Sequence, residues 1–418
     1  MSGAPTAQRF FGWQVAWAAL VLGVFGFGLG FHGTGIYLRT IVDTKGWSVS
    51  LVSAAVTIHF LAAAAVMPAL AFLYRRFGVA QITKLGALTL ALGVLGWATV
   101  DAPWGLFVAS LVSGAGWAAT CGVALNAIVT PWFDRQRPAA LSLAYNGGSI
   151  GGLIFPTIWA VAIGFLGFPW AALIVCAVMT ITIWMLAGRF FVQSPASMGL
   201  APDGGASTAT TGPFVASAAM PLPGSLLWRN RRFITLAAGM ALGFFAQFGM
   251  IAHLFSLLVP ALGTQAAGVA LGAIGLAAIL GRQVCAKLLV PGRDRRVAAA
   301  FNLGVQILGS IVFFAASGDS VFLLLTGVVL FGLGLGNGAS LPPLIAQVEF
   351  TKDDVSRAVP AIIGIAQATS AFGPMVFGLI RDLMVGCATS VCVNTPLVFA
   401  TAATIQFLAC ACFLIGRR

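Results

Sequence analysis

The chain has 418 residues, of which 60% are hydrophobic and only 8% are charged, and its mean hydropathy is +1.01. So apolar a composition excludes a soluble globular protein and a disordered chain, and seven cysteines are too few for a disulfide-stapled fold. A polytopic membrane protein remains. One membrane-spanning helix takes about 20 apolar residues, so this length fits about twelve spans.

The apolar segments are separated by short polar turns, and each one that is long enough to cross a bilayer is predicted to be a helix. The first segment is longer than a signal-peptide core and is interpreted as a retained helix. The predicted spans are 12–37, 49–73, 80–100, 104–131, 138–166, 168–191, 233–261, 265–290, 297–317, 320–346, 358–381 and 394–415.

The net charge of +12 fixes an orientation rather than indicating a nucleic-acid partner. With the N-terminus inside, most of the 22 basic residues fall in cytoplasmic loops, as the positive-inside rule requires. Both termini are therefore predicted to be cytoplasmic, in a multi-pass protein of the cell membrane, with a bacterial inner membrane as the expected location.

A stretch rich in Gly, Ser, Thr, Ala and Pro divides the spans into two sets of six, because such a composition cannot form a packed core. The predicted organisation is a bundle over 1–192, a flexible cytoplasmic linker over 193–230 and a bundle over 231–418. The bundles repeat each other at an offset of 218, which indicates a parallel repeat. The offset relates Gly114, Gly116 and Pro156 to Gly332, Gly334 and Pro374.

The order of twelve helices, a long central loop and a basic turn after the second helix resembles the major facilitator superfamily. The segments FFGWQVAWAALVLG, TPWFDRQRPAALSLAYNGGSIGGLIFP and ILGRQVCAKLL resemble its bacterial monocarboxylate and oxalate/formate branch. The resemblance implies a secondary transporter of two six-helix bundles, and no enzyme. The family's gating turn corresponds here to Arg75, Arg76 and Gly78, with Arg75 in place of the usual acidic residue.

Arg282 is the clearest candidate for binding a substrate, because it lies within an apolar helix where an isolated charge is costly. Its planar guanidinium matches a carboxylate bidentately, and the family resemblance implies a carboxylate-binding arginine in this eighth helix. Two alternatives stay open, namely snorkelling to the cytoplasmic interface and pairing with the carbonyls of a broken helix.

All three histidines fall inside predicted spans. His32 and His253 are candidates for proton coupling or for hydrogen bonding to a substrate oxygen, because histidine titrates near neutral pH. His59 is expected to have a packing role. The neutral candidates for the lining are Asn126, Tyr145, Asn146, Gln247, Asn337 and Gln367, with Met250 beside them. The glycine run after Asn146 is expected to pack against helix 8.

The expected function is transport of a small organic anion, namely a monocarboxylate, with or without proton coupling. The alternatives are efflux of amphipathic drugs, which usually needs a buried acid, and copper uptake through His and Met side chains. No cofactor, metal or nucleic-acid partner is indicated, and a monomer is expected. Cys387 and Cys392 flank an external loop where an oxidising compartment would permit a disulfide.

Overall fold

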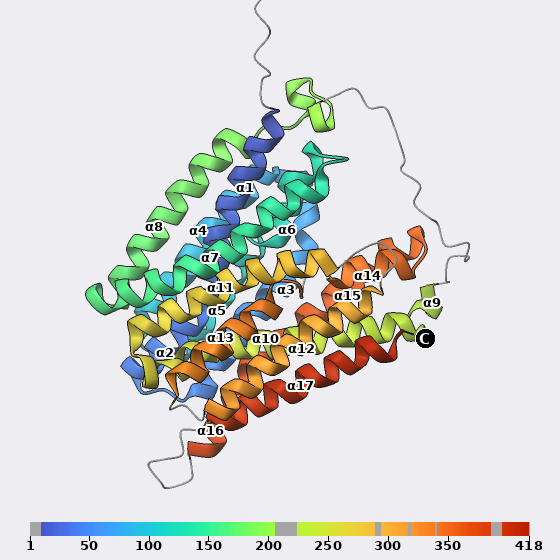
Figure 1. Ribbon diagram of the computed structural model, residues 1–418. Coiled ribbons are helices and arrows are strands. Elements are labelled where there is room, and N and C mark those ends of the chain that lie inside the picture. Colours follow the sequence, from blue (N-terminus) through green and yellow to red (C-terminus); the bar gives the residue numbers. More distant parts are fainter. Residues whose placement is uncertain are drawn as a thin grey trace, which may run out of the picture.

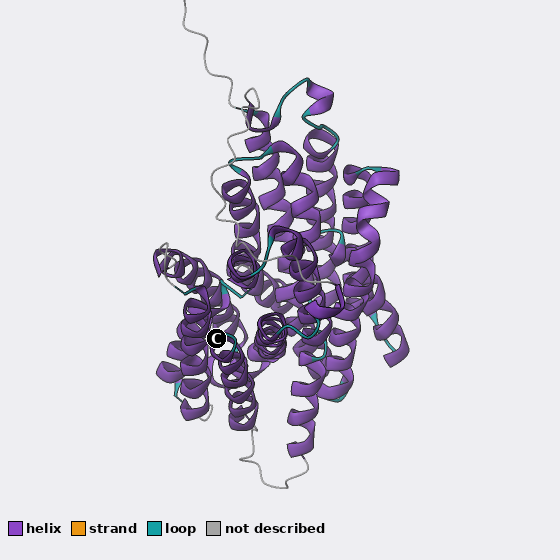
Figure 2. Cartoon of the chain, turned by 90° about the vertical axis from the view of Figure 1, so that its right-hand side faces the viewer, coloured by secondary structure: helices purple, strands orange, loops and turns teal. Residues whose placement is uncertain are grey.

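The computed structural model describes residues 10–204, 224–288, 294–316, 320–338, 341–385 and 395–417 (Figure 1). Over these residues the chain forms helices and no strand (Figure 2). The helices of the N-terminal group are α1 (Phe11–Phe27), the π-helical η1 (Gly28–His32), α2 (Gly33–Lys45), α3 (Val49–Phe77), α4 (Val79–Thr99), α5 (Pro103–Ala118), α6 (Gly122–Val129), α7 (Arg137–Leu166) and α8 (Phe168–Leu186).

The second group follows the predicted linker and contains the remaining long helices. Its elements are α9 (Gly224–Leu227), α10 (Arg231–Leu262), α11 (Thr264–Leu288), α12 (Arg295–Ala316), α13 (Val321–Leu335), α14 (Leu341–Glu349), α15 (Lys352–Ser370), α16 (Gly373–Val385) and α17 (Thr395–Ile415). We call these helices the C-terminal group.

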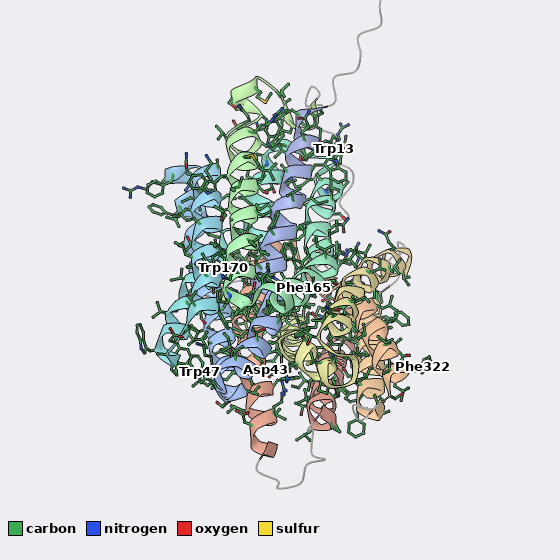
Figure 3. The ribbon with its side chains drawn as sticks, turned by 90° about the vertical axis from the view of Figure 1, so that its left-hand side faces the viewer. Trp13, Asp43, Trp47, Phe165, Trp170 and Phe322 are labelled. Carbon is green, nitrogen blue, oxygen red and sulfur yellow. The ribbon has the colours of Figure 1, made fainter. Side chains whose placement is uncertain are left out.

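Among the described residues, eleven helices are long and apolar enough to cross a membrane. The predicted tenth span is instead two pieces, α13 and α14, and is too short to count as one continuous helix. The other predicted bounds lie within a few residues of the observed ones, except that the first span runs on to Lys45. Figure 3 shows Trp13 and Asp43 toward opposite ends of this first span.

Local signals explain where several helices begin and end. The Ser48 hydroxyl accepts a hydrogen bond from the N–H of Leu51 at the start of α3, and the Asn230 side chain caps α10 in the same way. Gly78 separates α3 from α4 with φ +81°, a conformation that favours glycine. The polar side chains and glycines between apolar segments therefore set the helix boundaries.

The glycine run in α7 packs against the eighth span, α11, as predicted, and also against α1. A Cβ at Gly147 would lie 2.2 Å from the backbone oxygen of Leu20, and one at Gly151 would lie 2.5 Å from that of Val24, so these two glycines face α1. On the side of α11, a Cβ at Gly275 would lie 2.6 Å from the backbone oxygen of Ser149 and 2.8 Å from the carbonyl carbon of Gly152.

The two groups approach each other at one end and diverge toward the end that holds the beginning of α1 and the C-terminus (Figure 1). At the converging end, the backbone N–H of Met375 donates to Thr57 Oγ1 at 3.2 Å, which joins α16 to α3. This end is extracellular in the orientation predicted from the charges. The structure is therefore closed on the predicted outer side and open toward the predicted cytoplasm.

The first part of the predicted linker lies against the N-terminal group. The Asp203 carboxylate accepts hydrogen bonds from the backbone N–H groups of Asp134 at 3.1 Å and of Arg135 at 2.6 Å. These N–H groups precede α7, where the helix dipole favours a negative charge. Residues 205–223 of the linker and the predicted disulfide between Cys387 and Cys392 lie outside the described residues.

Candidate functional site

The half-buried side chain of Arg282 on α11 reaches across to the N-terminal group. Its Nη1 donates to Asn146 Oδ1 at 2.5 Å and its Nη2 donates to Ser149 Oγ at 2.9 Å, both on α7. Its Nε donates to the carbonyl oxygen of Gly336 at 3.3 Å, which follows α13. The guanidinium therefore joins three helices from both groups, at the contact between them.

All the hydrogen-bond partners of Arg282 are neutral. No carboxylate of the described residues lies within ion-pair distance of it. A guanidinium has five N–H donors, and the three bonds to Asn146, Ser149 and Gly336 leave two of them. A partly buried cation without a counter-ion attracts an anion, and the remaining donors provide the means to hold one.

The fourth and tenth spans, which are equivalent in the two halves of the repeat, are both broken, and the breaks expose backbone carbonyls in this region. The fourth span is interrupted after Ala118 and resumes at Gly122, and the tenth is interrupted after Leu335 and resumes at Leu341. The two breaks match the offset of 218 to within about one residue, which extends the evidence for the repeat. Irregular backbone at membrane depth requires partners inside the protein, and Arg282 supplies one for Gly336.

A buried amide network stabilises the break in the tenth span. Asn302 Nδ2 and Gln306 Nε2, both on α12, donate to the carbonyl oxygen of Gly334 at 2.6 Å. Asn337 Nδ2 donates to Asn302 Oδ1 at 2.9 Å and to the carbonyl oxygen of Gly281 at 3.2 Å. Because Gly281 precedes Arg282, this network fixes the backbone that carries the arginine.

Gln247 of α10 joins the same network, since its Nε2 donates to Gln306 Oε1 at 3.1 Å. A pocket in the C-terminal group is lined by Gln247, Asn302, Gly338 and Phe244 among others. Gln247 and Asn337 are among the lining residues predicted from the sequence, whereas Asn302 and Gln306 are not. Their spacing of four residues, which puts both on one face of an apolar helix, was the available signal.

His32 lies beside this site. It ends the π-helical segment η1, and its ring fills the space where a Cβ of Gly152 would stand, 2.6 Å from Nε2. Gly152 lies one helical turn after Ser149, so His32 and Arg282 approach the same stretch of α7 from different helices.

His253 has a different set of partners from Arg282, near the closed end. Its Nε2 lies 2.9 Å from the carbonyl oxygen of Pro374 and 3.4 Å from Ser53 Oγ. The guanidinium of Arg381 lies 3.1 Å from Nδ1. Because a guanidinium can only donate, Nδ1 accepts from Arg381 and Nε2 carries the proton that is donated to Pro374. His32 and His253 thus share no described partner.

His59 is fully engaged within the N-terminal group, with Nδ1 2.8 Å from Ser113 Oγ and Nε2 2.9 Å from the carbonyl oxygen of Gly30. Both ring nitrogens therefore have partners, which agrees with the packing role expected for His59.

The remaining predicted lining residues are dispersed. Asn126 is exposed on α6, and its Nδ2 donates to Tyr145 Oη of α7 at 2.6 Å, so these two bind each other. Gln367 on α15 has a buried Nε2 without a partner in the described structure. Met250 is fully buried in the apolar core. Neither Asn126 nor Gln367 shares a described hydrogen bond with Arg282.

The predicted gating turn is exposed. Arg75 and Arg76 have no carboxylate partner among the described residues, and the guanidinium of Arg76 stacks over Phe77. In the described part of the chain, no three His, Cys, Asp or Glu side chains are grouped so that they could hold a metal ion. The histidines and methionines considered for copper are thus not assembled with such ligands there.

The family model described as "Major Facilitator Superfamily" matches residues 18–378. The chain belongs to the major facilitator superfamily. As a member of the major facilitator superfamily it is a multi-pass membrane protein and a secondary transporter, and not an enzyme. No curated protein matches the chain significantly.

Solved structures of other transporters share the fold at low sequence identity. A bacterial homologue of the human lysosomal transporter Spinster, inward-facing and unoccupied, has a TM-score of 0.71 and 16% identity, and 99% of each chain is covered. The nucleoside transporter NupG also has a TM-score of 0.71 and 16% identity, over 98% of this chain and 99% of that one. Both likenesses concern the fold alone, and the branch predicted from the sequence remains a prediction.

Proposed function

We propose that this transporter carries a small organic anion, specifically a monocarboxylate, and that Arg282 binds the carboxylate. The observation that supports the proposal is a half-buried guanidinium at the contact between the two helix groups, with only neutral partners. A carboxylate arriving from the open side would take up the two remaining N–H donors. Rocking of the two groups about this contact would then expose the site to each side in turn.

A single negative charge fits the site better than two. The half-buried Arg381 lies near the closed end, is bound to His253 and Ser256, and shares no described partner with Arg282. A dicarboxylate would need a second cation close to the first. A cationic drug is disfavoured by the same arginine, since no described carboxylate offsets its charge.

The test is uptake of labelled monocarboxylates into proteoliposomes, with and without an inward proton gradient. Replacement Arg282→Ala should reduce uptake by about 100-fold, because hydrogen bonds to charged groups contribute about 1.5–3 kcal/mol each. Arg282→Lys should restore little, because an ammonium group lacks the planar fork. Arg189→Ala, which removes an exposed arginine over Phe190, is the matched control and should transport normally.

Uptake by Arg282→Ala at the wild-type rate would refute the proposed role of the arginine. Dependence of uptake on the proton gradient would establish symport, and His32 is then the proton-coupling candidate that lies beside the site. Uptake that is insensitive to the gradient would instead indicate facilitated diffusion or exchange of anions.

A further inference from the structure

We infer that the substrate is an aromatic monocarboxylate, whose ring is held by phenylalanines of both helix groups while its carboxylate lies on Arg282. The inference rests on the proposed function of Arg282 and adds the chemical class of the group attached to the carboxylate. It comes from the aromatic side chains that pack on the two segments to which the arginine is hydrogen-bonded.

Four phenylalanines form a continuous belt between the two groups. The ring centroids of Phe27 and Phe31 are 6.5 Å apart, those of Phe31 and Phe248 are 4.8 Å apart, and those of Phe248 and Phe244 are 5.9 Å apart. Phe27 and Phe31 belong to α1 and η1, whereas Phe244 and Phe248 belong to α10. The belt therefore crosses from one group to the other between Phe31 and Phe248.

Both ends of the belt reach the residues that hold Arg282. The ring of Phe27 lies over Gly148, where a Cβ would be 3.2 Å from it, and Gly148 precedes the Ser149 that binds the arginine. The ring of Phe244 lies over Gly338, where a Cβ would be 2.9 Å from it, two residues after Gly336. Aromatic rings thus pack on both segments that bind Arg282, one residue from Ser149 in α7 and two residues from Gly336 in the tenth span.

The rings of the belt differ in how far they are covered. Phe248 is buried, whereas Phe27, Phe31 and Phe244 are half-buried and keep exposed surface. The rings of Phe31 and Phe248 meet at an interplanar angle of 67°, and those of Phe244 and Phe248 at 27°. The surface that the half-buried rings keep exposed can offer a further ring the same edge-to-face and offset contacts, which aromatic pairs prefer. Such contacts favour a planar ring over a saturated one of similar size.

Small polar acids fit these surroundings less well. The hydroxyl or keto oxygen of a short hydroxy or keto acid would meet phenylalanine rings and lose its hydrogen bonds with water. An unsubstituted aromatic acid brings only its carboxylate as a polar group, and Arg282 is placed to receive it. The ring then excludes water from the guanidinium, which strengthens the charge-assisted hydrogen bonds.

The experiment compares benzoate with cyclohexanecarboxylate, which has the same carboxylate on a saturated ring of similar size, and with pyruvate. Uptake into proteoliposomes is measured at pH 7.5, and the flux into Arg282→Ala proteoliposomes is subtracted to remove diffusion of the protonated acids. Benzoate should have an apparent affinity about three to ten times that of cyclohexanecarboxylate, as expected for one or two aromatic contacts.

The replacements Phe27→Leu and Phe244→Leu should each lower this ratio toward one without abolishing Arg282-dependent uptake. The control is Phe322→Leu, because Phe322 points outward from the C-terminal group (Figure 3) and should leave the ratio unchanged.

The outcomes separate the two proposals. Arg282-dependent uptake of pyruvate but not of benzoate would overturn the inference and leave the proposed function intact, as would a preference for benzoate that neither Phe27→Leu nor Phe244→Leu alters. The absence of any Arg282-dependent carboxylate uptake would refute the proposed function itself.

Discussion

The carboxylate of Asp382 on α16 accepts a hydrogen bond from the backbone N–H of Ser50 at 2.7 Å and so joins the C-terminal group to the first turn of α3. The N–H groups in the first turn of a helix have no partner within the helix, and the helix dipole favours a negative charge there. Asp382 therefore stabilises contact between the groups at the predicted outer side.

Replacement Asp382→Ala should weaken this closure and shift the population toward the outward-open state. A hydrogen bond to a charged group contributes about 1.5–3 kcal/mol, which corresponds to roughly a 10- to 100-fold change in the ratio of the two states. The shift can be measured by electron–electron resonance between spin labels at Thr44 and Val321, after replacement of the native cysteines.

The matched control is Asp101→Ala, because Asp101 is 90% exposed and pairs with Lys45 within the N-terminal group. It should leave the distance distribution unchanged. An unchanged distribution in Asp382→Ala as well would show that the bond to Ser50 does not hold the outer side closed.

The contact between His253 and Arg381 leads to a second prediction. A neutral His253 accepts from Arg381 and donates to Pro374, and a glutamine can do both with its amide group. His253→Gln should therefore retain most of the thermal stability. His253→Ala should lose about 1–3 kcal/mol, because the buried guanidinium loses an acceptor.

The same pair of variants tests proton coupling. A second proton on His253 would lie against the guanidinium of Arg381, so we expect His253→Gln to keep whatever dependence on the proton gradient the wild type shows. Loss of that dependence, with the protein still folded, would identify His253 as the coupling residue and contradict a purely structural role for its contact with Arg381. The thermal stabilities of His253→Gln and His253→Ala are compared by differential scanning fluorimetry in detergent.

The spans and the candidate arginine could be predicted from the sequence because each depends on local properties. A run of about 20 apolar residues must form a helix in a bilayer, and a charge inside such a run stands out. Arg282 was accordingly selected without knowledge of any neighbour, and one of the alternatives considered for it, a carbonyl of a broken helix, is also present at Gly336.

The partners of these residues could not be predicted, because they come from segments far apart in the chain. Arg381 is the last residue of the predicted span 358–381, yet its side chain packs on His253, 128 residues earlier. The π-helical segment that positions His32 and the break after Leu335 depend on contacts with other helices. Neither the π-helical segment nor the break can be recognised from the spacing of apolar residues in the sequence.

A third prediction concerns a buried ion pair at the open end of the C-terminal group. The side chain of Arg296 is only 1% exposed, and it donates from Nε and Nη2 to both carboxylate oxygens of Glu349, at 2.6 and 2.8 Å. It also donates to the carbonyl oxygen of Arg232 at 2.8 Å. One side chain thus ties α12 to the end of α14 and the start of α10.

Removing one member of such a pair leaves the other charge buried and unpaired, which typically costs about 3–5 kcal/mol. Glu349→Gln should therefore lower the thermal unfolding temperature of the detergent-solubilised protein by several degrees. Asp101→Asn is the matched control, since Asp101 is 90% exposed in its pair with Lys45 and such pairs contribute at most about 1 kcal/mol. If the two variants unfold at the same temperature, the Arg296–Glu349 pair does not hold these helix ends together. A selective loss in Glu349→Gln would mean that the C-terminal group depends on this ion pair, whereas the exposed Arg75 and Arg76 of the N-terminal group have no carboxylate partner among the described residues.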